Sequence, residues 1–110
     1  MNTHVASRQT EIFRALGDPT RRAVYERLIA REESVSTLTA HFGVSQPAIS
    51  QHLKTLRDTG LVEVRREGRQ AHYRAGAQGL KPLMDLFSHY EQFWRSRGED
   101  LKAVLKDMGE

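Results

Sequence analysis

Polar side chains that carry little charge recur at helical spacing within residues 45–60, which read SQPAISQHLKTLRDTG. Ser50, Gln51 and Lys54 share one side of a helical wheel, and the apolar residues of the stretch occupy the other side. Hydroxyl and amide groups can hydrogen-bond to base edges in a major groove, and a lysine can contact a phosphate. The competing interpretation is an ordinary solvated helix face, and the neighbouring segments favour the first.

A helix over residues 45–59 must present these side chains, and the sequence contains its end signals. Ser45 is a suitable N-cap, Pro47 suits the first turn, and Gly60 suits the position after the end. Upstream, Ser36 can cap a shorter helix that a glycine-containing turn joins to the first. Two helices joined in this way, the second with an exposed polar face, predict a helix-turn-helix over residues 36–60.

After this helix the apolar period changes to the alternation of β-strands. Residues 61–75 predict a two-stranded hairpin that turns at Gly68 and carries Arg65, Arg66 and Arg69 near its tip. A basic hairpin directly after a helix-turn-helix is placed to reach a phosphate backbone or the minor groove. A solvated hairpin tip is the alternative.

The segments before the helix-turn-helix have a structural role in this interpretation. Residues 1–7 are expected to form a disordered arm. Ile12 and Phe13 belong to the apolar stripe of a first helix, and Asp18 can cap a second helix.

A seven-residue apolar repeat runs through residues 80–108 and is typical of a coiled-coil seam. We expect one long helix there, bent or ended early near Gly98, because glycine costs about 1 kcal/mol relative to alanine inside a helix. Such a helix is longer than a small domain can cover, so its apolar side chains need a partner. The simplest partner is a second copy related by a two-fold axis, and packing on the first helix of the same chain is the alternative. The residues expected at the dimer interface are Ile12, Phe13, Leu83, Phe87, Tyr90, Trp94 and Leu101.

Length and composition limit the possible classes of protein. The 110 residues predict a single domain over residues 1–110 with a modest core. Cysteine is absent, which excludes disulfides, thiolate metal sites and cysteine nucleophiles. No run approaches the roughly 20 apolar residues of a membrane span, and no signal peptide is evident, so we expect a cytoplasmic protein. No paired nucleophile and base, glycine-rich phosphate loop or carboxylate dyad stands out, so an enzyme is not expected.

The net charge of +3 is concentrated in the middle of the chain. Residues 45–75 contain six basic and three acidic residues, whereas residues 1–44 carry a net +1 and residues 76–110 a net −1. A polyanion partner at this part of the molecule accounts for the pattern, and a fluctuation among few charges is the alternative.

The order of these elements resembles that of the ArsR family of bacterial winged-helix repressors. The segments that carry the resemblance lie within about residues 12–105 and read FRALGDPTRR, HFGVSQPAISQHLKTLRDTGLV and RREGRQAHYR. The resemblance implies a mainly α fold with a small β-hairpin and a long C-terminal dimerisation helix. It also implies a homodimer that binds an imperfect palindrome of double-stranded DNA in its own operator and is released by some signal. The positions expected to face DNA are Ser45, Gln46, Pro47, Ser50, Gln51, Lys54, Arg65, Arg66 and Arg69.

The chain departs from this family at the positions where many members bind metals. A Cys-x-Cys pattern of the family aligns with Ser34 and Ser36, which cannot hold a soft metal. In a second site, an Asp-x-His pair aligns with Asp85 and Phe87, so the histidine is missing. We therefore expect no metal or other cofactor, and the inducer stays open. A winged-helix module that binds another protein and does not read DNA is the second hypothesis, and it would require an apolar outer face over residues 48–58.

Overall fold

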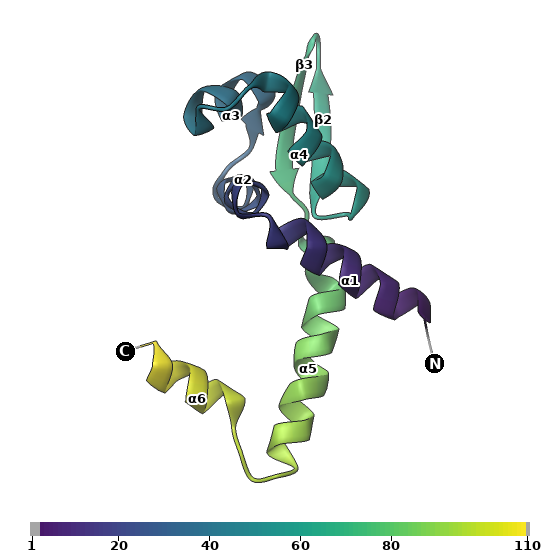
Figure 1. Cartoon of the computed structure of the whole chain (residues 1–110), viewed down its shortest axis with the longest axis vertical. Helices are drawn as coiled ribbons and strands as arrows, with labels where there is room; N and C mark the ends of the chain where they lie inside the picture. Colours follow the sequence, from purple (N-terminus) through teal and green to yellow (C-terminus); the bar gives the residue numbers. More distant parts are fainter. Residues whose placement is uncertain (1–2, 110) are drawn as a thin grey trace.

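Figure 1 shows the chain as a computed structural model, which describes the backbone of residues 3–109 and the side chains of residues 8–109. In order, the elements are α1 (Thr3–Gly17), α2 (Pro19–Ala30), β1 (Glu33–Ser34), α3 (Val35–Phe42), α4 (Gln46–Asp58), β2 (Val62–Glu67), β3 (Gln70–Ala75), the 3₁₀ turn η1 (Ala77–Leu80), α5 (Lys81–Arg95) and α6 (Leu101–Met108). This is the expected mainly α, winged helix-turn-helix fold with a small sheet. No helix among the described residues has the length and apolar character needed to cross a bilayer.

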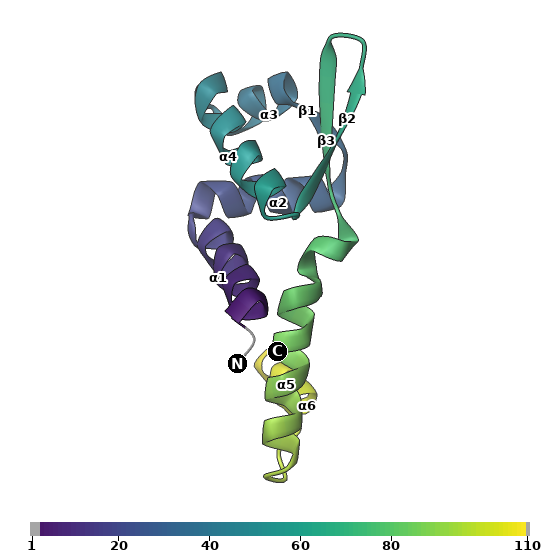
Figure 2. The same ribbon diagram turned by 90° about the vertical axis from the view of Figure 1, so that its right-hand side faces the viewer.

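The molecule has two parts, which we call the head (residues 3–80) and the tail (residues 81–109). The wing, formed by β2 and β3, and helix α5 point to opposite ends of the molecule (Figure 2). The overall extents are 54 × 38 × 22 Å and the radius of gyration is 16.7 Å. A compact domain of this length would have a radius of gyration of about 13 Å, so the tail projects well beyond the head.

Helices α1 and α2 meet at a corner that their own polar groups close. The Asp18 carboxylate accepts a hydrogen bond from the Arg21 amide at 2.8 Å, which caps α2 as expected and holds the pKa of Asp18 below its usual value. The Arg21 guanidinium donates to the Ala15 carbonyl at 2.6 Å, and Arg22 donates to the Leu16 carbonyl at 2.7 Å. Both arginines therefore satisfy carbonyl groups at the end of α1, where helices lack intrahelical donors.

The start of α1 differs from the prediction. The helix begins at Thr3, where we expected a disordered arm over residues 1–7, and residues 1–2 of that arm lie outside the described residues.

The hydrophobic core lies in the head, between α1, α2, the helix-turn-helix and the base of the wing. Ile12 is part of it, with 2% of its surface exposed, so the prediction that Ile12 contributes to a dimer interface is wrong. The buried apolar residues among those described are Ile12, Ala15, Val24, Tyr25, Leu28, Leu38, Ile49, Leu53, Leu56, Leu61 and Val62.

A third strand, β1, was not predicted and connects the wing to the helix-turn-helix. The strand order is β1-β3-β2, all antiparallel, and Ser34 of β1 lies opposite His72 of β3. This pairing places the start of α3 at Val35, with Ser34 as the N-cap. The Ser34 hydroxyl accepts a hydrogen bond from the Thr37 amide at 3.2 Å, so the predicted cap at Ser36 is wrong by two residues.

The strand β1 also carries a buried carboxylate. Glu33 is 7% exposed and forms two hydrogen bonds with the Arg27 guanidinium of α2, at 2.6 and 3.0 Å. These bonds lower the pKa of Glu33 below its usual value. Fork-shaped pairing of this kind fixes geometry as well as charge, so it holds β1 against α2.

The long helix expected over residues 80–108, bent or ended early near Gly98, is divided into two helices at that position. Helix α5 ends at Arg95, Gly98 has a φ of 84°, and α6 begins at Leu101 after Asp100, whose carboxylate accepts from the Lys102 amide at 3.0 Å. The Glu99 amide donates to the Trp94 carbonyl at 2.9 Å and closes the turn. Glycine can adopt this left-handed conformation without strain, which explains the break at this position.

Candidate nucleic-acid interface

The predicted polar face of α4 is exposed, and its apolar stripe is buried. Ile49, Leu53 and Leu56 are each at most 1% exposed and pack into the head. The predicted DNA-facing residues of this helix are all exposed: Ser45, Gln46, Pro47, Ser50, Gln51 and Lys54. The amphipathic division made from the sequence is therefore confirmed as a division between core and surface.

Both ends of α4 are fixed as the sequence predicted. At the start, the Ser45 hydroxyl accepts from the Ala48 amide at 3.2 Å. At the end, Gly60 has a φ of 81°, and the Leu61 amide returns to the Leu56 carbonyl at 2.9 Å. The turn at Gly60 sends the chain directly into β2, so helix and wing are covalently adjacent.

Lys54 is exposed and also forms an ion pair with a residue of its own helix. Its amino group lies 2.8 Å from the Asp58 carboxylate, and both side chains are more than 60% exposed. Exposed pairs at this spacing contribute only about 0.3–0.5 kcal/mol. The pair is weak enough to open, so Lys54 remains able to contact a phosphate.

The wing turns through two residues, Gly68 and Arg69. Glu67 and Gln70 are the last paired residues of β2 and β3, and Gly68 has a φ of 61°. A glycine at the first central position is typical of the tight turns that suit twisted hairpins. The side chain of Arg69 is thus placed at the tip of a short and well-defined turn.

The three arginines expected near the wing tip, Arg65, Arg66 and Arg69, do not share one role. Arg65 donates to Glu32 at 3.0 Å and to Glu67 at 2.8 Å. The bonds to Glu32 and then to Glu67 raise the pKa of Arg65, and the pKa of both carboxyl groups is lowered. Arg66 and Arg69 are exposed, and neither has an ion-pair partner within the described part of the chain. Arg65 thus braces the wing against the segment before β1, while Arg66 and Arg69 are available to an external anion.

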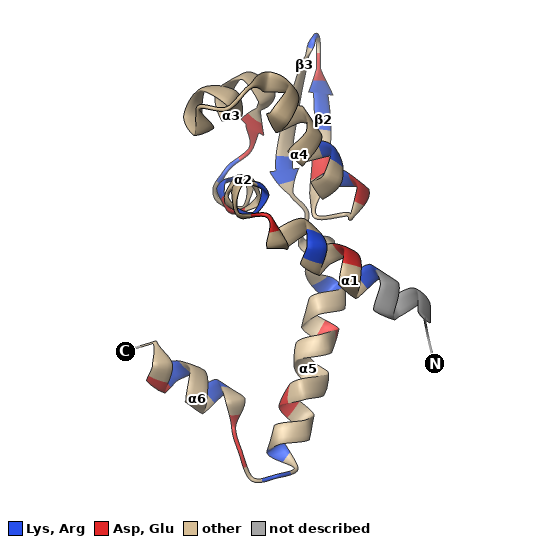
Figure 3. Cartoon of the chain, viewed as in Figure 1, with Lys and Arg blue, Asp and Glu red and all other residues tan. Residues whose placement is uncertain are grey.

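Uncharged polar surface lies beside this basic wing. Figure 3 shows basic positions along β2 and at the hairpin tip, next to α3 and the first turns of α4. Neither α3 nor residues 46–53 contain a charged residue. This combination suits a surface that contacts phosphates at its edge and bases at its centre.

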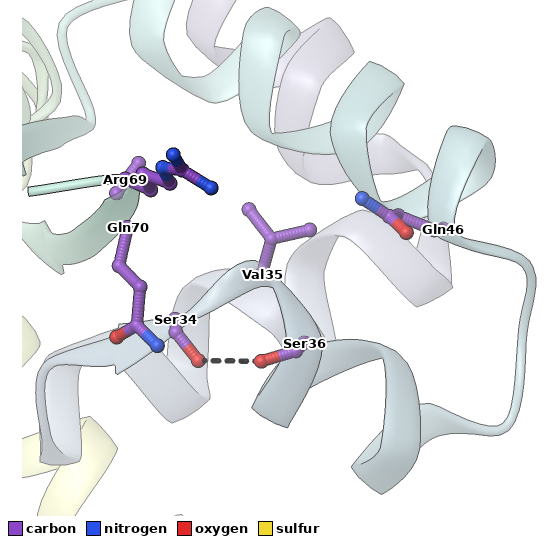
Figure 4. A pocket seen from close by; sticks show the side chains of 7 residues that line it. Ser34, Val35, Ser36, Gln46, Arg69 and Gln70 are labelled. Carbon is purple, nitrogen blue, oxygen red and sulfur yellow. Dashed lines mark hydrogen bonds between the residues drawn. The ribbon is translucent and has the colours of Figure 1, made fainter.

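A groove of about 240 Å³ separates the wing tip from the helix-turn-helix (Figure 4). It is lined by Ser34, Val35, Ser36, Gln46, Arg69, Gln70 and Ala71. Arg69 and Gln46 extend toward each other from opposite sides of the groove. Sequence reasoning assigned Gln46 and Arg69 to the DNA-facing set, but it did not connect them with Ser34 and Gln70.

Three of the seven residues expected at a dimer interface are exposed, three are half-buried and Ile12 is buried. Phe13 is 54% exposed, Tyr90 51% and Trp94 41%. Leu83 packs partly against the head core, and Phe87 and Leu101 are half-buried within the chain. Apart from Ile12, the predicted set therefore presents apolar surface on α1, α5 and α6.

The positions that resemble metal sites of the family contain other groups here. The Ser34 and Ser36 hydroxyls lie 3.1 Å apart. Asp85 accepts from the Lys81 amino group at 3.0 Å, in an exposed helical pair. Among the described residues, no cluster of three or more His, Cys, Asp or Glu side chains has a metal-binding arrangement.

Comparisons with known families, curated relatives and solved structures agree on one family. Residues 16–65 match a family described as a helix-turn-helix domain. A probable mercury resistance operon repressor of Streptomyces lividans is 41% identical over 74 residues, which cover 67% of this chain and 59% of the relative. The arsenical resistance operon repressor of Escherichia coli K12 is 31% identical over 101 residues, covering 89% and 82% of the two chains. A solved ArsR-like transcriptional regulator from Rhodococcus sp. RHA1 superposes with a TM-score of 0.75 at 30% identity, over 100% of this chain and 98% of that one.

Proposed function

The chain belongs to the ArsR family of winged helix-turn-helix regulators, and from this premise we propose that it is a homodimeric repressor that binds an imperfect palindrome in its own operator. The observation that carries the proposal is the exposed, nearly uncharged polar face of α4 beside two wing arginines, Arg66 and Arg69, that are free of ion pairs among the described residues. Its site of action would be the cytoplasm, where the DNA of a bacterium lies.

The exposed side chains divide into two classes of contact. Gln46, Ser50 and Gln51 have hydroxyl and amide groups that can read base edges, each worth about 1–3 kcal/mol of discrimination when well placed. Lys54, Arg66 and Arg69 would neutralise phosphates and release counterions. Arg65 is left out of this second class because Glu32 and Glu67 already hold its guanidinium.

The exposed apolar face of α5 supports the dimer. Tyr90 and Trp94 lie one helical turn apart and are about half-exposed. A two-fold axis along this face would bury both copies of it and keep the two α4 helices on one side. Two recognition helices about 34 Å apart would then enter successive major grooves on the same face of the DNA.

A mobility-shift assay with the DNA upstream of the chain's own reading frame tests the proposal. We expect retarded complexes of one dimer on DNA that contains the palindrome. Gln51→Ala should relax sequence preference and leave the salt dependence nearly unchanged. Arg66→Ala should weaken binding to all sequences and flatten the salt slope by about one unit per site.

Two outcomes would contradict the proposal. Absence of any retardation at low salt would favour a winged-helix module that binds another protein. Equal effects of Gln51→Ala and Arg66→Ala on specificity and salt slope would overturn the division between base and phosphate contacts. Circular dichroism of both variants is the control for folding, since both side chains are exposed.

A further inference from the structure

The groove between the wing tip and α3 is lined by five hydrogen-bonding side chains, by Val35 and Ala71, and by no carboxylate. Its polar side chains belong to Ser34, Ser36, Gln46, Arg69 and Gln70. The nearest acids in the sequence, Glu33 and Glu67, are paired with Arg27 and Arg65. The charge that faces the groove is therefore the positive charge of Arg69.

The Ser34 hydroxyl contacts those of Ser36 and Thr37, and the three groups leave one proton free, on either Ser36 or Thr37. The Ser34 oxygen accepts from the Thr37 amide and lies 3.1 Å from the Ser36 oxygen and 3.0 Å from the Thr37 hydroxyl. Ser34 has a single proton to donate. When Ser36 accepts it, the Ser36 proton can point to an acceptor in the groove. Ser36 also lies in the first turn of α3, where the helix end is positive.

The two sides of the groove are held at a fixed separation. Ser34 on the floor pairs through β1 with His72 of β3, two residues from Gln70 on the wall. The Arg65–Glu32 ion pair connects β2 to the residue just before β1. A binding site whose walls are already in place loses less entropy when it is filled.

We propose that this groove seats one phosphate group of the DNA backbone, with the Arg69 guanidinium and the Ser36 hydroxyl as its ligands and the Gln46 amide at the rim. The inference rests on the proposed DNA-binding function. The chemical group that these side chains would bind is a phosphate oxyanion. The DNA backbone is the source that the geometry favours, because the groove opens between the first residue of the recognition helix and the wing (Figure 4).

The test combines protein variants with DNA in which one phosphate at a time is replaced by an uncharged methylphosphonate. With the unaltered protein, we expect one backbone position in each half-site at which neutralisation weakens binding about tenfold, equivalent to ~1.4 kcal/mol. Arg69→Ala and Ser36→Ala should each remove most of that penalty at that position. Arg66→Ala is the matched control, because it deletes a wing arginine outside the groove and should keep the penalty.

The remaining outcomes separate this inference from the function on which it rests. Specific DNA binding in which Arg69→Ala keeps the full penalty at every position would overturn the phosphate seat and leave the repressor function standing. No binding to any DNA would overturn both. A calorimetric titration of the DNA-free protein with inorganic phosphate, at constant ionic strength, separates the two sources. Saturable binding that Arg69→Ala abolishes would overturn the DNA backbone as the source and assign the groove to a free phosphate.

Discussion

The head and the tail of the molecule use apolar side chains in opposite ways. In the head, the residues of α4 that face inward are at most 1% exposed. Helices α5 and α6 lie wholly within the described residues and contain no buried side chain, although Tyr90, Trp94 and Leu105 are large and apolar. Burial of apolar surface is worth about 25 cal/mol per Å². The head gains this free energy from its own chain, whereas the large exposed side chains of the tail can gain it only from another molecule.

The largest expected effect compares the same substitution in the two regions. Leu53→Ala in α4 should reduce the free energy of unfolding by about 2–5 kcal/mol, because it opens a cavity in a packed core. Leu105→Ala in α6 removes the same atoms from a side chain that is 53% exposed and should cost well under ~1 kcal/mol. Urea unfolding of protein dilute enough to be monomeric measures both. Equal losses would show that the tail is packed as firmly as the head.

The second effect concerns association instead of folding. Trp94→Ala should weaken the dimer about 30-fold, because buried tryptophans at interface centres contribute ~2 kcal/mol or more. Ile29→Ala is the control, since Ile29 is 57% exposed but lies on α2 of the head. Sedimentation velocity over a series of protein concentrations gives both dissociation constants. A Trp94→Ala protein that dimerises like the unaltered one would remove α5 from the interface.

In the head, the sequence predicted the features whose determining residues lie close together along the chain, and it missed those that depend on distant residues. The face of α4 follows from helical spacing between residues 45 and 59, and its ends follow from Ser45 and Gly60, so all were predicted. The strand β1 has only two residues, which are too few to show alternation. Its partner in β3 lies 38 or more residues away, so nothing local indicates the pairing or the Ser34 cap that it determines. The Arg65–Glu32 bond spans 33 residues and is equally hidden.

The tail shows a different limit of sequence reasoning. Trp94 and Leu101 are seven residues apart, which suggested one long helix that bends or ends early near Gly98. The repeat records only the spacing of side chains, and a five-residue turn between two helices preserves it. The available signals for the break were Gly98 itself and Asp100, an acidic residue able to cap the helix that follows.

The third prediction tests the joint between the regions. A Cβ atom on Gly79 of η1 would lie 2.9 Å from the Leu61 Cα atom and nearer still to the Gly60 carbonyl oxygen. Gly79→Ala must therefore displace α5 from the turn that ends α4, and we expect a loss of about 1–3 kcal/mol in the free energy of unfolding. Thermal unfolding measures it. Gly17→Ala is the control, because no atom lies within 4 Å of the added Cβ.

The smallest expected effects compare ion pairs of the two regions. Glu33→Gln removes the charge from a carboxylate that is 7% exposed and fork-bonded to Arg27, so we expect a loss of about 1 kcal/mol at neutral pH. Asp85→Asn removes the exposed partner of Lys81 in the tail and should cost about 0.3–0.5 kcal/mol or less. Urea unfolding at pH 7 ranks the two variants.

The dependence on pH identifies the cause of the loss in Glu33→Gln. The hydrogen bonds from Arg27 hold the pKa of Glu33 below its usual value of 4.5. A carboxyl group whose pKa is lower in the folded state contributes stability above its unfolded pKa, and this contribution is lost as the pH falls through the folded pKa. The difference in unfolding free energy between the unaltered protein and Glu33→Gln should therefore be constant from pH 7 to about pH 5. It should shrink below pH 4.5. A difference that stays constant into acid would mean that the variant loses packing in the head, since only the ionised carboxylate responds to protons in that range.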